Sequence, residues 1–358
     1  MARHNQDGIV SGLSTNRAEC PARLRENNSE TLIAQCATRL SNRKGLLEPV
    51  DERVGFKRRI ESVQFSAHAK PRKTESLSCF KWMLQMGKSN SLPPAGHYDA
   101  NYGNFQTELY AQIRHEAFGE DIGQNSWLTS AEQDRFLEWL DLSPGKALLD
   151  VACGAGGPAL RIAASTGCSV VGIDVHDRAV TTANSLAAQR GLAERAEFRS
   201  TDASKPLPFS NATFDAITCI DAINHFSDRS CVIGEWARLL KVGGRLLFTD
   251  PITVTGALTN AEIATRSSAG FYLFVPGGYN ERVLAKCGLQ LLICEDATAN
   301  MAKVAEARRA ARESRSAALR EIEGDQAYDG QQEFLAVAAR VAREGRLSRF
   351  LYVSKKSN

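Results

Sequence analysis

The sequence has few features of a membrane, secreted or metal-binding protein. No apolar run approaches the roughly 18–20 residues that cross a bilayer, and the first thirty residues lack the apolar core of a secretory signal. The nine cysteines are scattered, without a C-x-x-C pair or a Cys/His cluster at zinc-ligand spacing. These absences predict a cytoplasmic protein with free thiols, no metal site and no stable insertion in a membrane.

The composition excludes a wholly disordered or collagen-like chain, because 43% hydrophobic and 24% charged residues are close to the globular average. The charge is uneven: residues 1–96 hold 16 Lys and Arg against 9 Asp and Glu, and the remainder holds 28 against 32. Residues 1–96 show no sustained period of 2 or 3.6, so we predict a mostly disordered basic extension. Alternatively, this arm contacts nucleic acid or an anionic membrane, or translation starts at Met83 or Met86 and the arm is not native protein.

Residues 97–358 have the pattern of a folded domain. Helical spacing and a capping box predict two cap helices within 104–140. Apolar runs at 147–152, 169–174, 197–201, 214–220, 244–250, 289–294 and 348–354 then alternate with helical segments, and a segment rich in Ala, Arg and Glu fills 297–346. The sequence therefore predicts an α/β fold: a doubly wound, seven-stranded, mostly parallel sheet with an N-terminal helical cap and a helical insertion before the last strand.

A buried strand at 147–152 runs into a glycine turn that opens a helix. Gly154, Gly156 and Gly157 remove side chains where a ligand has to approach the backbone, and Pro158 suits a first helical turn. Asp174 ends the next strand, twenty residues after Gly154, where a carboxylate can accept both hydroxyls of a ribose. This spacing predicts a nucleotide or nucleoside site.

Asp150 helps to decide which of two kinds of ligand such a turn holds. The glycine spacing also fits a nicotinamide-dependent oxidoreductase. A carboxylate four residues before Gly154 would repel a pyrophosphate, whereas it could hold an ammonium group through bound water or backbone. A nucleoside with an amino acid end, such as S-adenosylmethionine, is therefore favoured.

Three ordered motifs carry a family resemblance: D-V-A-C-G-A-G-G at 150–157, G-I-D at 172–174 and L-L-K-V-G-G-R-L-L-F-T-D-P at 239–251. Together they resemble the class I S-adenosylmethionine-dependent methyltransferases, which have a Rossmann-like fold. The resemblance implies that this cofactor binds and that its methionine end, ribose and adenine contact, among others, Asp150, Ala152, Gly154, Gly156, Asp174, Val175, Asp202, Ala203 and Ile220. Alternatively, Asp202 is a turn residue that caps Ser204.

The motif D-A-I-N-H-F at 221–226, with G-E-D-I-G at 119–123, resembles the branch of sarcosine/dimethylglycine and phosphoethanolamine N-methyltransferases. In the phosphoethanolamine enzymes the histidine that matches His225 forms a catalytic pair with a tyrosine. This chain has Ile122 where that tyrosine would align. The resemblance makes His225 the candidate catalytic base, and a structural histidine beneath the cofactor is the alternative.

The acceptor is expected to be a small molecule, because the chain lacks both the N-P-P-Y type motif of amide and adenine methylation and a Pro-Cys nucleophile. An amine is the preferred acceptor, with no nucleic acid partner, and oxygen or carbon methylation and a binding-only relative remain alternatives. Aromatic faces hold amines well, and the candidates are Tyr98, Tyr102, Trp127, Tyr272 and Tyr279. The insertion and cap are expected to roof the acceptor site. Alternatively, the insertion is a solvated helical pair that forms dimer contacts. The protein is expected to be a monomer or a homodimer. The insertion contains a series of arginines that either form an exposed face or contact an anionic substrate headgroup: Arg308, Arg309, Arg312 and Arg315.

Overall fold

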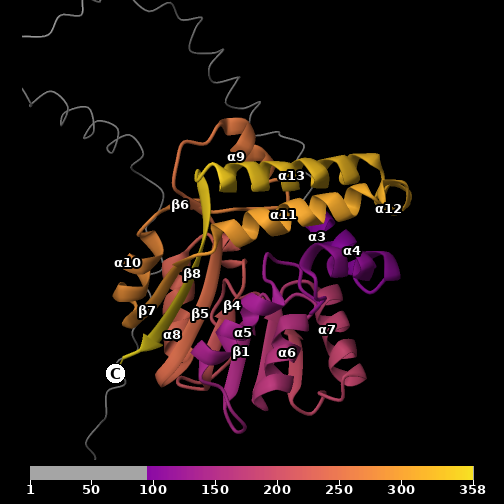
Figure 1. Ribbon diagram of the computed structural model, residues 1–358. Coiled ribbons are helices and arrows are strands. Elements are labelled where there is room, and N and C mark those ends of the chain that lie inside the picture. The colour runs from indigo at the N-terminus through magenta and orange to yellow at the C-terminus, as the bar shows by residue number, and fades with distance from the viewer. Residues whose placement is uncertain (1–94, 358) are drawn as a thin grey trace, which may run out of the picture. The chain divides into compact units, whose positions relative to one another are not determined.

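The computed structural model describes residues 95–357 (Figure 1). The basic extension predicted over 1–96 and the alternative start at Met83 or Met86 lie outside these residues, except for the last two residues of the extension, which begin helix α3. Within residues 95–357, no helix combines the length and apolarity that a bilayer span requires.

One sheet organises the described chain. Its strands follow the order β3-β2-β1-β4-β5-β8-β7, and the two-residue β6 pairs with the end of β5. All neighbours on this path are parallel except β8, which runs antiparallel to both β5 and β7. The predicted seven-stranded, mostly parallel sheet is confirmed, with strands β1 (Ala147–Val151), β2 (Ser169–Asp174), β3 (Ala196–Ser200), β4 (Phe214–Cys219), β5 (Leu240–Val254), β6 (Val275–Pro276), β7 (Leu289–Asp296) and β8 (Leu347–Lys356).

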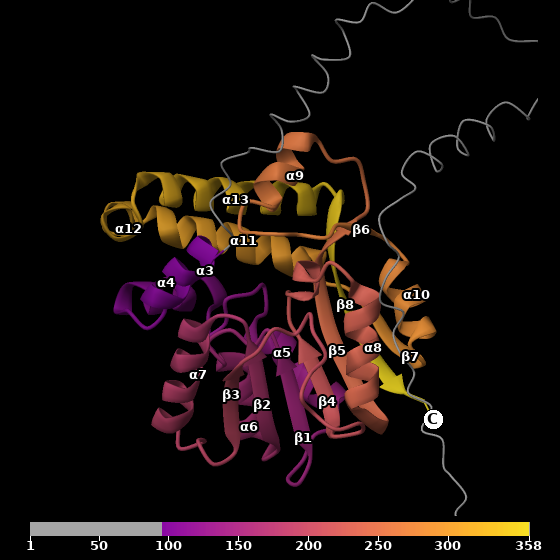
Figure 2. The ribbon, with the colours of Figure 1, turned by 180° about the vertical axis from the view of Figure 1, so that it is seen from behind.

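Helices cover both faces of the sheet, as buried strands require. On one face, α5 (Ser130–Leu140), α6 (Gly157–Thr166) and α7 (Asp177–Gln189) pack over Leu148 and Val170 (Figure 1). On the other, α8 (Arg229–Leu239) and α10 (Tyr279–Lys286) pack over Leu149 and Val151, with Trp236 fully buried between them and the strands (Figure 2). These two cores explain why the apolar strand runs were continuous rather than alternating.

A further helical layer lies across the carboxyl ends of the parallel strands (Figures 1 and 2). It contains α4 of the predicted cap and the predicted insertion before the last strand, and α11 packs against both α4 and α13. The second helix predicted for the cap, α5, packs on the face of the sheet instead, because its apolar residues Phe136 and Leu140 join the core there. The layer consists of α3 (Ala95–Asn104), α4 (Glu108–Phe118), α9 (Asn260–Arg266), α11 (Thr298–Glu313), α12 (Ser316–Glu323) and α13 (Asp325–Arg343). It roofs the edge of the sheet at which parallel α/β proteins bind ligands.

Several parts of the secondary structure differ from the prediction, which had neither helix α3 nor the short strand β6. Strand β5 was expected at 244–250 but extends at both ends, because it continues through two irregularities: Gly243, with a φ of +80°, lies where its register against β4 shifts, and Pro251 lies where its register against β8 shifts. Helix α9 was not predicted, although Thr259 and Glu262 form a capping box at its start. That signal was present in the sequence.

Candidate functional site

A cavity of about 510 Å³ lies at the carboxyl ends of β1, β2 and β4. Its volume is within the range of about 300–1,000 Å³ typical of small-molecule sites. Among the residues singled out from the sequence, the cavity brings together Asp150, Ala152, Gly154, Asp174, Val175, Asp202, Ala203, Ile220 and His225. Gly156 is not among the residues that line it.

The turn after β1 is closed by a side chain from the next strand. Gly154 has a φ of +55°, and its amide donates a 2.9 Å hydrogen bond to Oδ2 of Asp174. Oδ1 of Asp174 accepts from the His176 amide, also at 2.9 Å. A carboxylate oxygen can accept more than one hydrogen bond, so Asp174 can hold the turn and still accept from a ligand hydroxyl.

The other two glycines serve packing rather than ligand approach. A Cβ on Gly156 would lie 2.8 Å from both Ala183 Cβ and Phe198 Cζ, and a Cβ on Gly157 would lie 2.2 Å from the Ile122 carbonyl oxygen. The sequence interpretation that all three glycines admit a ligand therefore fits Gly154 better than Gly156 and Gly157. The helix α6 comes close to its neighbours because these two side chains are missing.

Asp150 is almost fully buried at the inner wall of the cavity. Burial raises its pKa to about 7, while the hydroxyl of Thr218, which donates a 2.7 Å hydrogen bond to Oδ1, opposes the rise and the charge of Asp174 adds to it. The carboxyl group is thus close to half-ionised at neutral pH. A cation bound next to it would favour the charged form.

Four of the residues that the resemblance assigns to the cofactor, Val175, Asp202, Ala203 and Ile220, line the cavity together. The Val175 side chain is exposed and lines the cavity with Ile220 and Ala203. Asp202 lines it too, but its Oδ1 accepts from the amide and hydroxyl of Ser204, and Lys205 forms an ion pair with its other oxygen at 3.1 Å. The alternative interpretation of Asp202 as a turn residue therefore describes its local contacts.

His225 has a tyrosine partner that the sequence did not reveal. Tyr98 of α3 places its hydroxyl 3.1 Å from Nε2 of His225, and Nδ1 lies 3.2 Å from the carbonyl oxygen of Phe271. A carbonyl only accepts, so Nδ1 carries the proton and Nε2 accepts from Tyr98. Ile122, where the resemblance would put the tyrosine, is instead buried in the core and lies outside the cavity lining.

The electrostatic environment keeps both members of this pair neutral. Burial lowers the pKa of His225 to about 4, although the Phe271 carbonyl opposes the shift. Burial also raises the pKa of the Tyr98 phenol well above its usual value. At neutral pH the pair is a neutral imidazole that accepts from a neutral phenol.

The aromatic candidates divide between three places. Tyr98 and Tyr102 line the large cavity, whereas Trp127 and Tyr272 line a smaller cavity beside it. Tyr279 packs against the core under α8 and α10 and lines neither of these cavities. Four of the five predicted aromatics thus lie near the ligand crevice, and Tyr279 does not.

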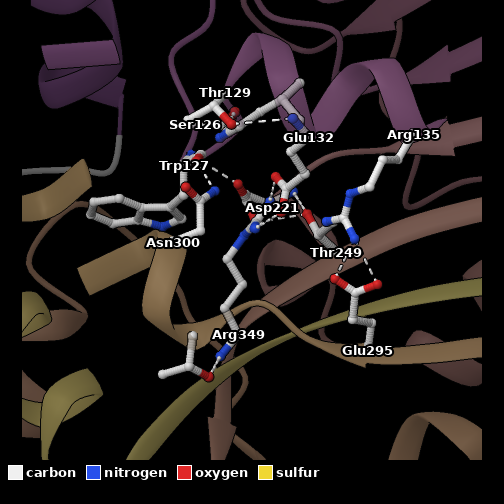
Figure 3. Close-up of polar contacts among 12 residues, drawn as sticks. Ser126, Trp127, Thr129, Glu132, Arg135, Asp221, Thr249, Glu295, Asn300 and Arg349 are labelled. Atoms are coloured by element: carbon white, nitrogen blue, oxygen red, sulfur yellow. Dashed lines mark hydrogen bonds and ion pairs between the residues drawn. The ribbon is translucent and has the colours of Figure 1, made fainter. Parts of the chain in front are cut away.

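Asp221, which lines both cavities, belongs to a buried ion network (Figure 3). Arg349 of β8 forms a bidentate pair with Glu132 of α5, at 2.7 and 2.9 Å, and its Nε donates to Asp221 at 2.7 Å. The other carboxylate oxygen of Asp221 accepts from the Trp127 amide, and the Thr249 hydroxyl donates to the first. This network fixes the loop before α5 to the sheet, and sequence spacing gave no signal for it.

Residues 95–357 contain no group of three or more His, Cys, Asp or Glu side chains that could hold a metal ion. The six cysteines in the same range are free thiols.

Comparison with known proteins identifies relatives of this chain. The profile of a family described as "Methyltransferase domain" matches residues 142–275. The chain is 30% identical over 201 residues to 27-O-demethylrifamycin SV methyltransferase of Amycolatopsis mediterranei (strain S699), covering 53% of this chain and 74% of that enzyme. It is 33% identical over 152 residues to sterol 24-C-methyltransferase erg6 of Schizosaccharomyces pombe, covering 40% of this chain but only 39% of that enzyme.

The fold also matches solved structures. Phosphoethanolamine N-methyltransferase 2 of Haemonchus contortus, in complex with phosphomonomethylethanolamine and S-adenosylhomocysteine, superposes with a TM-score of 0.62 at 20% sequence identity. The match covers 74% of this chain and 60% of that one. At this identity the similarity concerns the fold, and the named relatives transfer methyl groups to oxygen, carbon and nitrogen acceptors.

Proposed function

Because this chain belongs to the S-adenosylmethionine-dependent methyltransferases, we propose that it methylates a nitrogen atom of a small molecule held beside the Tyr98–His225 pair. The family uses S-adenosylmethionine, which removes the nicotinamide-dependent alternative. The observation that supports the proposal is the contact between the Tyr98 hydroxyl and Nε2 of His225 at the wall of the cofactor cavity.

The residues that line the large cavity fit this cofactor. Asp150 would face its ammonium group, Asp174 would accept from the ribose hydroxyls, and Val175 would contact the adenine with its exposed apolar side chain. Gly154 lacks the Cβ that would lie 2.9 Å from the Tyr102 hydroxyl. When bound, S-adenosylmethionine supplies an electrophilic methyl group on a sulfonium, so no metal or covalent intermediate is needed for transfer.

The size of the cavity favours a small acceptor. At about 10–15 Å³ for each water-sized group, the roughly 27 non-hydrogen atoms of the cofactor would occupy about 270–400 Å³ of the 510 Å³. The remaining volume of roughly 110–240 Å³ corresponds to about 7–24 such groups, which suits a small acceptor better than a sterol or a macrocycle. The proposal therefore differs in acceptor size from two of the named relatives.

The Tyr98–His225 pair would orient the acceptor. The phenol O–H donates to His225, and a phenol oxygen can also accept, so Tyr98 would accept an N–H from an amine and direct the nitrogen lone pair toward the methyl group. Well-oriented reactants can gain up to ~7–11 kcal/mol from positioning alone. The low pKa of His225 makes it a weak base. We therefore propose that the pair orients the acceptor and passes a proton on, and that His225 does not keep the proton.

Methylation of a hydroxyl group is the second candidate, because the relative at 30% identity is an O-methyltransferase by name. The same phenol oxygen could accept the hydrogen of an O–H group. The nature of the methylated atom distinguishes the two candidates.

The test is incubation with a panel of small metabolites and methyl-labelled cofactor, followed by mass spectrometry of the products. Three variants accompany it. Asp174→Ala should abolish calorimetric binding of S-adenosylhomocysteine, whereas His225→Ala and Tyr98→Phe should keep binding and lower kcat about 10²-fold or more. If Tyr98→Phe turns over at the wild-type rate, the pair has no catalytic role. If His225→Ala fails to fold, that variant supports a structural histidine and Tyr98→Phe decides.

A further inference from the structure

A second cavity, of about 60 Å³, adjoins the cofactor cavity under the helical layer. The two share five lining residues, so the smaller one lies directly beside the site where the acceptor would lie. The shared residues are Tyr98, Asn125, Ser126, Asp221 and Ala269. The smaller cavity also has two arginines in its lining, Arg266 from α9 and Arg308 from α11.

Arg266 is a buried cation that forms no ion pair within residues 95–357. It is 1% exposed, and its Nε and Nη1 have no hydrogen-bond partner among the described residues. Its guanidinium carbon lies 4.5 Å from the Phe334 ring centroid and 5.7 Å from that of Trp127. A ring face attracts the positive charge, but it offers no hydrogen-bond acceptor to the N–H groups that lie in the plane of the guanidinium. A buried donor without an acceptor costs about 1–3 kcal/mol, and more when it is charged.

Arg308 adds a second positive charge to the same cavity. Its guanidinium carbon lies 5.4 Å from the Trp127 ring centroid, and it forms no ion pair with any carboxylate that the structure describes. Burial and the neighbouring Arg312 lower its pKa to about 10, so it remains charged at neutral pH. Arg312 itself is paired with Glu323 at 2.6 Å.

The carboxylate that lines the smaller cavity, Asp221, already forms an ion pair with another arginine. Asp221 is paired with Arg349, which also holds Glu132, so this triad contributes a net charge of −1 against the two arginines. One positive charge stays uncompensated, next to N–H donors that lack acceptors. A bound anion would supply both the charge and the acceptors.

We infer that the smaller cavity binds an anionic oxygen group of the methyl acceptor, a carboxylate or a phosphate, through Arg266 and Arg308. The volume of about 60 Å³ corresponds to about four to six water-sized groups, which suits either group. The planar guanidinium fork matches both geometries. This inference rests on the proposed function and narrows its substrate class to acceptors that carry an anion a few atoms from the methylated nitrogen.

The first experiment uses inorganic phosphate and acetate as probes on the full chain saturated with S-adenosylhomocysteine. We expect one of them, at millimolar concentration, to raise the melting temperature and to give calorimetric heat. The probe that binds more tightly identifies a phosphoryl or a carboxylate group. Arg266→Met and Arg308→Met should lose the effect, whereas Arg309→Met, next to Arg308 but exposed, should keep it.

The second experiment uses the acceptor found in the metabolite panel. In Arg308→Met and Arg266→Met its KM should rise about 10- to 100-fold, because each loses a charge-assisted hydrogen bond, while the affinity for S-adenosylhomocysteine stays within twofold. An acceptor without an anion, or wild-type protein that binds S-adenosylhomocysteine but neither probe, would overturn the inference and leave the proposed function standing. Absence of S-adenosylhomocysteine binding would instead defeat the proposed function. If Arg266→Met does not fold, Arg308→Met and the wild-type titrations decide.

Discussion

Replacing Arg349 by Met should destabilise the protein far more than any surface ion pair could. The side chains of Arg349, Glu132 and Asp221 are 0%, 4% and 3% exposed. The variant leaves two buried carboxylates next to each other without their cation, and removing one partner of a buried pair costs about 3–5 kcal/mol. A free energy of unfolding of 5–15 kcal/mol is usual for a whole domain, so a large part of the stability would be lost.

A matched control lies in the same close-up (Figure 3). Arg135 and Glu295 form an ion pair of similar length, 2.6 Å, but their side chains are 42% and 36% exposed. Exposed pairs contribute about 0–1 kcal/mol. Arg135→Met should therefore change the free energy of unfolding by less than about 1 kcal/mol.

The measurement is urea unfolding at pH 7.5 followed by tryptophan fluorescence and circular dichroism, with midpoints compared at equal slope. Glu132→Gln in the Arg349→Met background should recover part of the stability. Equal losses for Arg349→Met and Arg135→Met would refute the assignment of the network as a buried, stabilising element.

Two further predictions concern the first turn of the cofactor site. Affinity for S-adenosylhomocysteine should fall up to tenfold per unit as the pH drops below about 7, because Asp150 with its pKa of about 7 then loses its charge; titration calorimetry at pH 6, 7 and 8 checks this, and Asp150→Asn should bind weakly without the pH dependence. Gly157→Ala should lower the free energy of unfolding by about 1–3 kcal/mol, since its Cβ would meet the Ile122 carbonyl at 2.2 Å. Gly330→Ala, with nothing within 4 Å in α13, should gain about 0.5–1 kcal/mol instead, and a stabilised Gly157→Ala would contradict the packing argument.

The sheet could be predicted closely from the sequence because its information is local. The strand at 147–152 ends one residue early, at Val151, and the strand at 169–174 is as expected. Continuous apolar runs, glycine turns and helical periods each leave a signature within ten residues. The cofactor turn follows the same logic, with Asp150, Gly154 and Asp174 all at the cavity.

The acceptor side could not be predicted in the same way. Tyr98 and His225 are 127 positions apart in the chain, and only the packing of α3 over the sheet brings them together. The resemblance directed attention to Ile122, which is buried elsewhere. Arg266 was overlooked because a single arginine at the end of a short helix looks like a solvated cap, and only its burial marks it as unusual.

The roof over the sheet also bears on what constitutes the minimal enzyme. The segment recognised as a methyltransferase domain spans 142–275 and contains the nucleoside-facing turn, yet Tyr98, Trp127 and Arg308 all come from outside it. A fragment trimmed to that segment would keep the residues proposed to contact the nucleoside. It would lose Tyr98, Trp127 and Arg308, one of the two arginines proposed to bind the anion. The proposed acceptor site thus depends on the flanks as well as on this segment, which itself contains His225 and Arg266.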